Sequence, residues 1–509
     1  MAGYKVFIPS AGTGSRIGSK LNKALTTLGD KPAISYIIDK IPEDVPIVVA
    51  IGYQGEILKD FLEIAYPNRD ITTFRVSKYE GDQSGLGITL LEAQPYLKDS
   101  PFIFCSNDTI VNEIPIPSVS YLGFSHSEDN TEYRSVKLVG GHPVELLPKG
   151  INHTPAYIGL VGICRKDVNL FWAIAKNLSN DPTFIRVGEA EIVRRMLPNI
   201  HAIKVEWHDI GNPIALTQAR IKYPGVCLPK ENEATWFIDN AVIKYHDDPR
   251  FIENRVIRAK ALKNYVPEII ETKTHFYKYN WINGAILSSV INVPIFERLL
   301  DTLGEFWGDS LTDKSNIANF YREKTWERWE DFRTRFEYTD KAEVINGMYC
   351  PAMEDILSSI NWDWLNGELY RFHGDLHFEN IVYNVVTKRF TLLDWRQDFA
   401  GLCNEMGDIY YDFAKLNHGL IVSHEQIQKN NYHYKVEPNG DVDVGILVPE
   451  KYIELQQILK KYVDSSGFEW DVVELLTYLI FLNSAPLHHY PYSHFLFHFA
   501  KYKLGQLLK

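Results

Sequence analysis

The stretch HGDLHFEN, which begins at His373, carries side chains suited to phosphoryl transfer. Such a reaction needs a base beside the accepting hydroxyl, oxygen ligands for Mg²⁺ and a cation on the donor phosphates. Asp375 is the candidate base, while Asn380 and Asp394, the latter in the run TLLDW, are the candidate Mg²⁺ ligands. His373 and His377 are expected to brace the loop by hydrogen bonds, since Mg²⁺ prefers oxygen ligands.

Residues on either side of this stretch complete the candidate site. Lys244, in the strand-like run AVIKYH, is a natural partner of the α- and β-phosphates of ATP. Glu253, near the start of the following helix, can pair with Lys244. The alternatives to Glu253 are Glu231, Glu233 and Glu268. Asp412, in GDIYYDFAKL, is expected to hold the catalytic loop in place.

A second candidate site follows the first predicted strand, in FIPSAGTGSRIGSKLNKAL. Its Gly-rich loop offers backbone N–H groups to a triphosphate, with two cations close behind. The loop is neither the GxGxxG of a dinucleotide-binding fold nor a Walker A motif, because no GK[ST] closes it. The candidate nucleotide-binding residues are Gly12, Thr13, Gly14 and Ser15, and the two cations are Arg16 and Lys23.

Two carboxylates stand where predicted strands of the N-terminal half end. Asp108 follows the apolar run PFIFCSN, and Asp209 follows VEWH. Because ligands bind at the carboxyl ends of parallel strands, we expect Asp108 and Asp209 to bind one Mg²⁺ on the α-phosphate of a nucleotide. A phosphate oxygen of a second substrate would then attack the α-phosphorus in line, without a covalent intermediate. Pyrophosphate would leave against Arg16 and Lys23.

Short β-rich runs alternate with amphipathic stretches from residue 4 to about residue 222, and these elements must position the N-terminal site. The alternation indicates an α/β fold with a Rossmann-like, mostly parallel sheet and helices on both faces. The predicted strands are residues 4–10, 46–52, 71–76 and 101–107, and the predicted helices are residues 31–41, 55–65 and 86–97.

Pro, Gly and charged residues cluster in YPGVCLPKENEA, which begins at residue 223, and we place the boundary between domains 1–225 and 226–509 there. The next run, TWFIDNAVIKYH, predicts two short strands joined by a turn at Asp239-Asn240. After Gly284 the pattern is mainly helical. A hairpin is expected further on, with a type I′ turn at Asn439-Gly440, and two or three helices follow it.

The totals restrict the class of protein. A chain of 509 residues should hold two or three domains. The net charge of −12 argues against a nucleic-acid partner, which would favour a basic face. Five widely spaced cysteines without a CxxC pair predict a reducing compartment and neither a disulfide framework nor a zinc site. With no signal peptide and no apolar run long enough for a membrane span, we expect a cytoplasmic protein.

The order of motifs in the C-terminal half, namely Lys244, HGDxHxxN, an apolar run ending in DW, and GDxxYDxAK, resembles the aminoglycoside phosphotransferase and choline kinase family over roughly residues 235–509. The resemblance implies an α+β, protein-kinase-like, bilobal domain that uses ATP and Mg²⁺. A small lobe would span about 230–283 and a helical lobe about 284–509. Arg396 replaces a frequent carboxylate, which leaves a second Mg²⁺ open, and the small lobe has no evident Gly-rich loop.

The substrates of that family are small hydroxyl compounds such as aminoglycosides, choline, homoserine and sugars. Choline would need an aromatic cage for cation–π contact. The candidate aromatic residues are Trp395, Tyr410, Tyr411 and Tyr490, which fit a hydrophobic core equally well.

The N-terminal half resembles the sugar-phosphate and phosphocholine nucleotidyltransferases over residues 4–222. The matching motifs are AGTGSR…NKAL, a strand ending in ND, AYIGLVGI and WxDIGNP. Lys23 is the signature lysine of the family, although Asn22 replaces the proline before it. The resemblance implies that Gln83, Ser84 and Gly85 contact base and ribose, and that Lys149 binds the acceptor phosphate. It also favours CTP over UTP.

Both resemblances together imply a bifunctional enzyme with Mg²⁺ at each site. The kinase half would phosphorylate an amino alcohol, polyol or sugar, and the N-terminal half would convert the ester to an NDP-activated donor for surface glycan or lipid decoration. Three alternatives are a half that only senses a nucleotide, an antibiotic-modifying phosphotransferase, and a protein kinase, against which HGD in place of HRD counts. The acceptor, the choice of nucleotide, channelling and the oligomeric state stay open.

Overall fold

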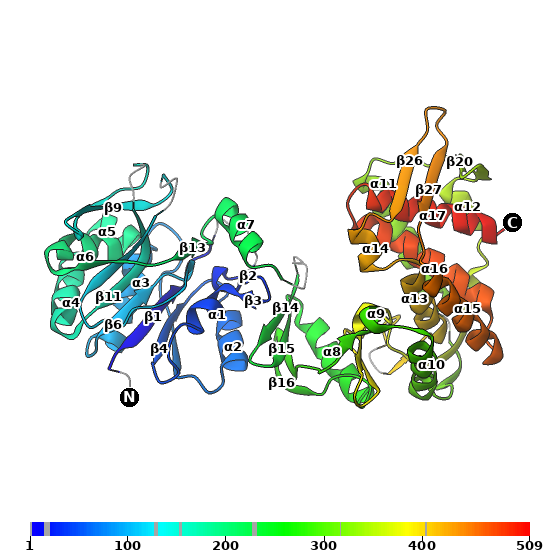
Figure 1. Cartoon of the computed structure of the whole chain (residues 1–509), viewed down its shortest axis with the longest axis horizontal. Coiled ribbons are helices and arrows are strands. Elements are labelled where there is room, and N and C mark those ends of the chain that lie inside the picture. The colour runs from blue at the N-terminus through cyan, green and yellow to red at the C-terminus, as the bar shows by residue number, and fades with distance from the viewer. Residues whose placement is uncertain are drawn as a thin grey trace. The chain divides into compact units, whose positions relative to one another are not determined.

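The computed structural model describes residues 3–509 except 15–20, 127–130, 152–154, 226–231, 316 and 403–404. The chain forms two compact units, each described by itself below (Figure 1). The N-terminal unit comprises Met1–Pro249 and Ile270–Tyr279, and the C-terminal unit comprises Arg250–Ile269 and Asn280–Lys509. Among the described helices, none combines the length and the apolar composition needed to cross a membrane.

A nine-stranded mixed sheet forms the centre of the N-terminal unit, in the order β10-β9-β11-β6-β1-β4-β5, with β8 beside β11 and β12 beside β8. Strands β6, β1, β4 and β5 are parallel, as predicted, whereas β11 runs antiparallel to β6, β8 and β9. The sheet is therefore mixed, because β12 also pairs parallel with β8 while β11 and β10 pair antiparallel with their neighbours. The bounds are β1 (Lys5–Ser10), β4 (Ile47–Ile51), β5 (Ile71–Arg75), β6 (Phe102–Cys105), β8 (Tyr121–Ser125), β9 (Arg134–Val139), β10 (His142–Leu147), β11 (Ala156–Ile163) and β12 (His201–Lys204).

Helices cover both faces of this sheet. Successive side chains of its strands point to opposite faces, where they join one of two hydrophobic clusters. Val6 and Ile8 of β1 join the cluster under α1 and α2, while Phe7 joins the cluster under α3, α4 and α6. Near-continuous apolar runs are typical of strands that are buried on both faces. The helices are α1 (Ala33–Ile38), α2 (Gly55–Ala65), α3 (Leu86–Leu97), α4 (Val168–Asn177), α5 (Pro182–Val187), α6 (Glu189–Met196) and α7 (Pro213–Lys222).

A four-stranded sheet in the order β14-β15-β17-β16 belongs to the N-terminal unit, although it covers much of the small lobe predicted for the kinase. Trp236 of β14 is fully buried and packs edge-to-face on Phe61 of α2 at 5.1 Å between ring centroids. The indole Nε1 of Trp236 donates a hydrogen bond to Thr27 Oγ1 at 3.0 Å. One hydrophobic core therefore joins the two sheets. The strands are β14 (Glu233–Ile238), β15 (Ala241–His246), β16 (Ile269–Lys273) and β17 (Phe276–Asn280).

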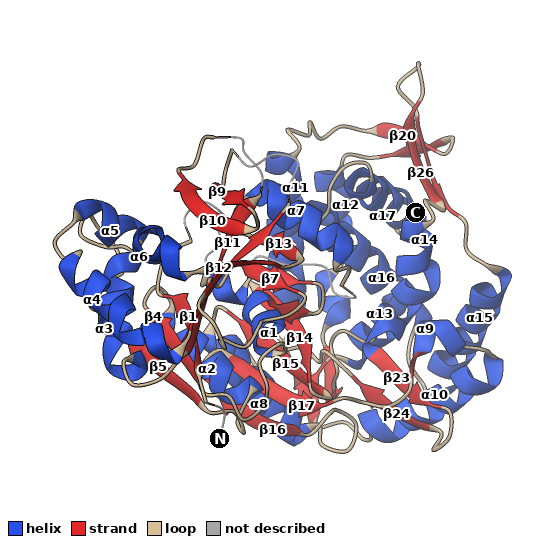
Figure 2. Ribbon diagram, turned by 60° about the vertical axis from the view of Figure 1, so that its left-hand side comes forward, coloured by secondary structure: helices blue, strands red, loops and turns tan. Residues whose placement is uncertain are grey.

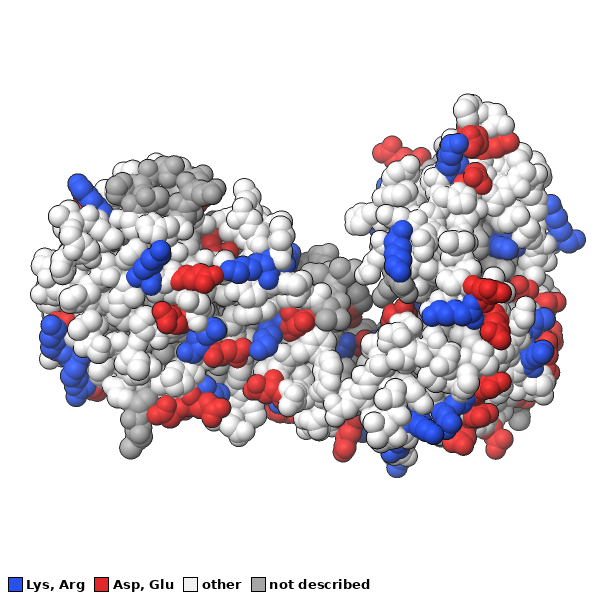
Figure 3. Space-filling model, viewed as in Figure 1, with Lys and Arg blue, Asp and Glu red and all other residues white. Residues whose placement is uncertain are grey.

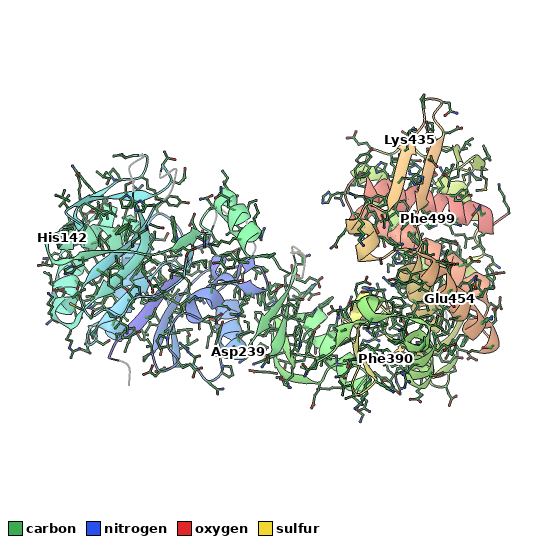
Figure 4. The ribbon with its side chains drawn as sticks, viewed as in Figure 1. His142, Asp239, Phe390, Lys435, Glu454 and Phe499 are labelled. Carbon is green, nitrogen blue, oxygen red and sulfur yellow. The ribbon has the colours of Figure 1, made fainter. Side chains whose placement is uncertain are left out.

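The predicted turn between β14 and β15 is confirmed: Asp239 and Asn240 have φ of 46° and 58° (Figure 4 labels Asp239). The later hairpin is also present, but its predicted turn type is wrong. Only Gly440 has positive φ, at 89°, because the Asn439 side chain accepts a hydrogen bond from the Asp441 N–H and organises a longer loop. This hairpin, β26 (Tyr432–Val436) and β27 (Val442–Ile446), extends beyond the helices of its unit (Figure 2).

The C-terminal unit is mainly helical, as predicted. Its longest helices are α8 (Pro249–Ala261), α10 (Val293–Trp307), α11 (Ala318–Arg335), α13 (Ile409–Ile421), α15 (Glu450–Ser465), α16 (Trp470–Ser484) and α17 (Tyr492–Leu507); shorter ones are α9 (Leu287–Val290), α12 (Met353–Ser359) and α14 (His424–Gln428). Its short strands include β18 (Ala285–Ile286), β19 (Thr312–Ser315), β20 (Glu343–Ile345), β21 (Met348–Cys350), β22 (Gly367–Arg371), β23 (Ile381–Asn384), β24 (Arg389–Leu392) and β25 (Met406–Gly407). Strands β22 and β23 flank the HGDLHFEN stretch.

Acidic and basic side chains are interspersed on the face shown in Figure 3. Outside the atoms drawn in grey, no extended basic patch is visible on that face. This distribution agrees with the net charge of −12.

Candidate active sites

A two-stranded ladder brings the two predicted carboxylates of the N-terminal unit together. Strand β7 (Thr109–Val111) pairs antiparallel with β13 (Trp207–Asp209), with Asp209 opposite Thr109. The backbone N–H of Ile210 also donates to the Asp108 carbonyl at 3.2 Å. The pairing explains how two residues far apart in the sequence reach one place at the edge of the sheet.

Gly211 lies directly between these carboxylates. A Cβ at this position would lie 2.8 Å from Asp209 Oδ1 and 3.0 Å from Asp108 Oδ2, so no larger residue fits without moving them. Asp209 accepts hydrogen bonds from the Gly211 N–H at 2.9 Å, from Tyr133 Oη at 3.0 Å and from Asn212 Nδ2 at 3.1 Å. Burial and the nearby Asp108 raise the pKa of Asp209, as expected of a carboxylate pair built to share a cation.

Lys23 is the cation of this cluster among the residues that the structure describes. Its Nζ pairs with Asp108 Oδ2 at 2.5 Å, and the lysine side chain is 10% exposed. Asn22, in the position of the family's proline, accepts a hydrogen bond from Ala24 N–H and donates from Nδ2 to the carbonyls of Ser10 and Tyr53. These bonds fix the lysine segment to the end of β1, so Asn22 acts as an N-cap where proline was expected.

The Gly-rich loop is described as far as Gly14, which has φ of 63° and whose Cβ, if present, would lie 3.2 Å from Lys23 Cβ. A glycine here lets the loop approach the lysine closely. Gly12 and Thr13 precede it in the same loop. Ser15 and Arg16 lie outside the described residues, so their predicted roles are untested.

The residues predicted to contact base and ribose lie between β5 and α3. Gln83 accepts a hydrogen bond from Lys78 Nζ at 2.6 Å, and Ser84 Oγ donates to the Gly81 carbonyl at 2.8 Å. Gly85 precedes α3, where a side chain would collide with the backbone of Ile185. Lys149 is exposed in the turn after β10. Their contacts with a substrate stay predictions.

Backbone hydrogen bonds join the two loops of the C-terminal unit that carry its candidate site. Leu393 N–H donates to the Asn380 carbonyl at 2.7 Å, and Arg396 N–H donates to the His373 carbonyl at 2.9 Å. Asp394, between these two bonds, has φ of 54°, a strained backbone for a residue with a side chain. Asp375 and Asp394 line the same cavity of about 280 Å³.

The two histidines brace the loop, as predicted. His373 Nδ1 accepts from Asp375 N–H at 3.2 Å, so its Nε2–H donates to the Leu393 carbonyl at 2.9 Å. Burial lowers the pKa of His373 to about 3, which keeps the ring neutral. His377 Nδ1 lies 3.0 Å from Glu379 Oε2; despite its burial, hydrogen bonds to Asp375 and Glu379 raise the pKa of His377 to about 9.

Asp375 is held as a carboxylate by its neighbours. Lys415 Nζ pairs with Asp375 Oδ1 at 2.7 Å, and Asn380 Nδ2 donates to Asp375 Oδ2 at 3.1 Å. Although burial favours the neutral acid, Lys415 and His377 keep the pKa of Asp375 well below its usual range. Since the amide nitrogen of Asn380 faces Asp375, its carbonyl oxygen is the atom suited to a metal ion.

Asp412 holds this loop, which confirms the prediction. Its Oδ1 accepts from Gly374 N–H at 2.7 Å, and its Oδ2 accepts from His373 N–H at 2.9 Å and from Trp307 Nε1 at 3.1 Å. Asp412 is fully buried, so these three donors replace the water that a carboxylate would otherwise bind.

Lys244 and Glu253, the predicted phosphate-binding pair, belong to different compact units. Lys244 lies on β15 opposite Thr235, and Glu253 is exposed on α8. Their pairing stays a prediction.

Sequence reasoning missed several residues that the structure places in the two sites. Lys415 lies in the motif GDxxYDxAK but had no assigned role. The one signal for Asn22 as an N-cap was its position just before a short helical turn. Tyr133 carries no sequence signal, because its contact with Asp209 spans 76 positions. Mg²⁺ suits the oxygen donors of both sites: Asp108 and Asp209 in one, Asn380 and Asp394 in the other.

No protein-family model matches the chain. The bifunctional protein GlmU of Francisella tularensis subsp. holarctica (strain OSU18) is 32% identical over 133 residues, which are 26% of this chain and 26% of that protein. GlmU of Francisella tularensis subsp. novicida (strain U112) is 35% identical over 108 residues, 21% and 22% of the two chains. The match thus spans about a quarter of the length of these relatives.

Among solved structures, the CTP:phosphocholine cytidylyltransferase LicC from Streptococcus pneumoniae is similar to 43% of this chain and 99% of its own, with a TM-score of 0.39 and 15% identity. The inositol-1-phosphate CTP transferase from T. maritima covers 44% of this chain and 98% of its own, with a TM-score of 0.33 and 14% identity. The region of this chain that matches nucleotidyltransferases is the N-terminal one.

Proposed function

We propose that the chain is a bifunctional enzyme that phosphorylates a small hydroxyl compound with ATP and then transfers a nucleotidyl group from CTP or UTP to the phosphate ester. The observation that carries this proposal is the presence, in one chain, of two separate clusters of carboxylates and a lysine beside a glycine-containing loop. One is Lys23, Asp108 and Asp209, and the other is Asp375, Asp394 and Lys415.

In the N-terminal unit, the triphosphate binds to the backbone of the loop at Gly12 and Gly14, with its α-phosphate beside Asp108 and Asp209. The ammonium of Lys23 forms an ion pair with Asp108 in the structure. It would exchange this partner for the phosphate oxygens as negative charge develops on them. The phosphate ester attacks in line, and pyrophosphate leaves. The N-terminal similarity to GlmU over 133 residues supports this half of the proposal.

In the C-terminal unit, Asp375 orients the hydroxyl of the acceptor and receives its proton as the hydroxyl oxygen bonds to the γ-phosphorus of ATP. The bond from that phosphorus to the β-phosphate oxygen breaks, and ADP leaves. Lys415 and Asn380 hold that carboxylate in position, and the hydrogen bonds between the two loops keep Asp394 beside it. Mg²⁺, when bound by Asp108 and Asp209 or by Asn380 and Asp394, neutralises the charge of the phosphates as a Lewis acid. The motif order HGDxHxxN, DW and GDxxYDxAK supports the assignment as a kinase.

A pair of variants tests the division of labour. Asp375→Asn should abolish ATP-dependent phosphorylation but leave nucleotidyl transfer from a supplied phosphate ester unchanged, and Asp108→Asn should do the reverse. Mass spectrometry of reactions with ATP, CTP or UTP, Mg²⁺ and a mixed panel of alcohols, polyols and sugars measures both products. If either change removed both activities from a protein with an unaltered thermal transition, the two-site proposal would be wrong.

A further inference from the structure

The cavity beside Asp375 has a strongly basic lining. Among the described residues, its walls carry five cationic side chains and two carboxylates, Asp375 and Asp394, around a volume of about 280 Å³. The cationic residues are Arg255, Lys324, Arg328, Arg396 and Lys415. If the proposed kinase function holds, the acceptor must occupy this cavity, because its hydroxyl has to reach Asp375.

The carboxylates of the protein do not balance this positive charge. Lys415 pairs with Asp375 at 2.7 Å, and Arg328 reaches Asp331 at 3.1 Å. Within the part of the chain that the structure describes, no carboxylate lies within ion-pair distance of Lys324 or Arg396. An excess of buried positive charge is costly unless a ligand supplies the opposite charge.

Arg255 adds to this excess. Its Nε and Nη1 are buried and have no hydrogen-bond partner among the described residues, while its guanidinium lies over the rings of Phe251 and Trp395. A planar guanidinium with unsatisfied N–H groups is suited to a carboxylate or phosphate.

The same contacts argue against a cationic acceptor. Tyr411 is the one aromatic side chain among the described residues that line the cavity, and cations of the protein already lie over its ring: Arg396 at 5.6 Å and Lys324 at 5.7 Å from the centroid. Arg396 Nη1 also donates to Tyr411 Oη at 3.3 Å. A choline ammonium would therefore meet repulsion from two cations instead of an open aromatic cage.

We propose that the hydroxyl compound phosphorylated at Asp375 is an anion, whose carboxylate or phosphate group binds to Lys324, Arg328 and Arg396 on the wall of the same cavity. This inference rests on the proposed kinase function and refines its substrate class. It excludes choline, ethanolamine and aminoglycosides as preferred acceptors.

The test uses matched probes with the full chain, ATP and Mg²⁺: gluconate and glucose 6-phosphate as anionic polyols, glucitol as the neutral counterpart, and choline as the cation. Phosphorylation of gluconate or glucose 6-phosphate well above that of glucitol and choline is expected, and the better of the two names the anionic group. Equal or better turnover of glucitol or choline overturns the proposal.

Binding is measured in parallel by calorimetry, with the site saturated by Mg²⁺ and a non-hydrolysable ATP analogue. We expect Lys324→Met to weaken binding of the better anion about tenfold, as the loss of one charge-assisted contact does, and Lys324→Arg to restore it. Arg322→Met, on the exposed side of the same helix, is the matched control and should change nothing. Failure of both anions to bind, or unaltered binding by Lys324→Met, overturns the proposal.

The two levels of the hypothesis fail in different ways. Anion binding without ATP consumption would contradict the kinase function and leave the anion site in place. ATP-dependent phosphorylation without preference for anions would contradict the anion site and leave the kinase function in place.

Discussion

At the scale of single residues, the site of the N-terminal unit depends on the absence of one methyl group. Gly211→Ala would place a Cβ 2.8 Å from Asp209 Oδ1 and 3.0 Å from Asp108 Oδ2, and both carboxylates would have to move. We expect nucleotidyl transfer to fall about a hundredfold, as misplaced catalytic groups do, with ATP-dependent phosphorylation unchanged. Steady-state rates of both reactions check this. Gly367→Ala, where a Cβ meets open space, is the control.

Tyr411 is the residue with the most informative titration. Burial opposes ionisation, but Lys324, Arg396 and Lys415 lower the pKa of Tyr411 to about 7, against the opposing effects of Asp375. Because the folded pKa lies below the unfolded value of 10, the ionised phenolate stabilises the fold fully above pH 10, and this contribution is lost as the pH falls through 7. The stacked Tyr321 contributes no charge near pH 7, since burial raises its pKa.

We therefore expect one of the 29 tyrosines to titrate near pH 7 by ultraviolet difference absorbance, and Tyr411→Phe to remove that transition. An identical tyrosinate titration in Tyr411→Phe would contradict this assignment. Tyr410→Phe, on the neighbouring position of the same helix, is the matched control, because burial raises the pKa of Tyr410.

How far single residues could be predicted depends on whether a sequence motif assigns them a role. The structural roles of His373 and Asp412 were predicted from their motifs, although the donors to Asp412 lie 38, 39 and 105 positions away. Tyr133 meets Asp209 only because β7 and β13 pair, and the charge of Lys415 matters only because α13 packs beside the loop. Such contacts depend on tertiary packing, which a single sequence does not reveal.

At the scale of elements, the sheet β14-β15-β17-β16 depends on Trp236. Its indole is fully buried against Phe61 and bonded to Thr27. We expect Trp236→Ala to destabilise the N-terminal unit by about 3–5 kcal/mol, the usual cost of such a cavity. Chemical denaturation followed by circular dichroism measures this change. Trp281→Ala, at a side chain that is 50% exposed, should cost far less; equal losses would refute a shared core.

The elements themselves were largely predictable. Strands and helices of the first hundred residues follow from alternating apolar runs, and Asp239-Asn240 forms the expected turn because both residues tolerate positive φ. The pairing of β11 with β6 was not predictable, because apolar strands carry no sign of direction. At Asn439 a side-chain hydrogen bond to the backbone competed with the expected turn type.

At the scale of the whole molecule, the predicted boundary at 225/226 and the compact units do not coincide. The N-terminal unit extends to Pro249 and also includes Ile270–Tyr279. Trp236, Ile243 and Phe276 belong to its hydrophobic core. A fragment of residues 1–225 would expose the apolar surface that they cover. We expect it to be less soluble and to melt at a lower temperature than residues 1–280, and a comparison of both fragments by calorimetry checks this.

The shared core also bears on how such a gene could change with time. Lys244, the lysine expected to serve the kinase, stands on a strand that the nucleotidyltransferase half needs for its own folding. Separation of the two coding regions at residue 225 would leave one product with an exposed hydrophobic core. The other product would carry Lys244 on a sheet that lacks the core against which it packs. The two halves are therefore expected to be inherited, lost and transferred together, as a single heritable unit.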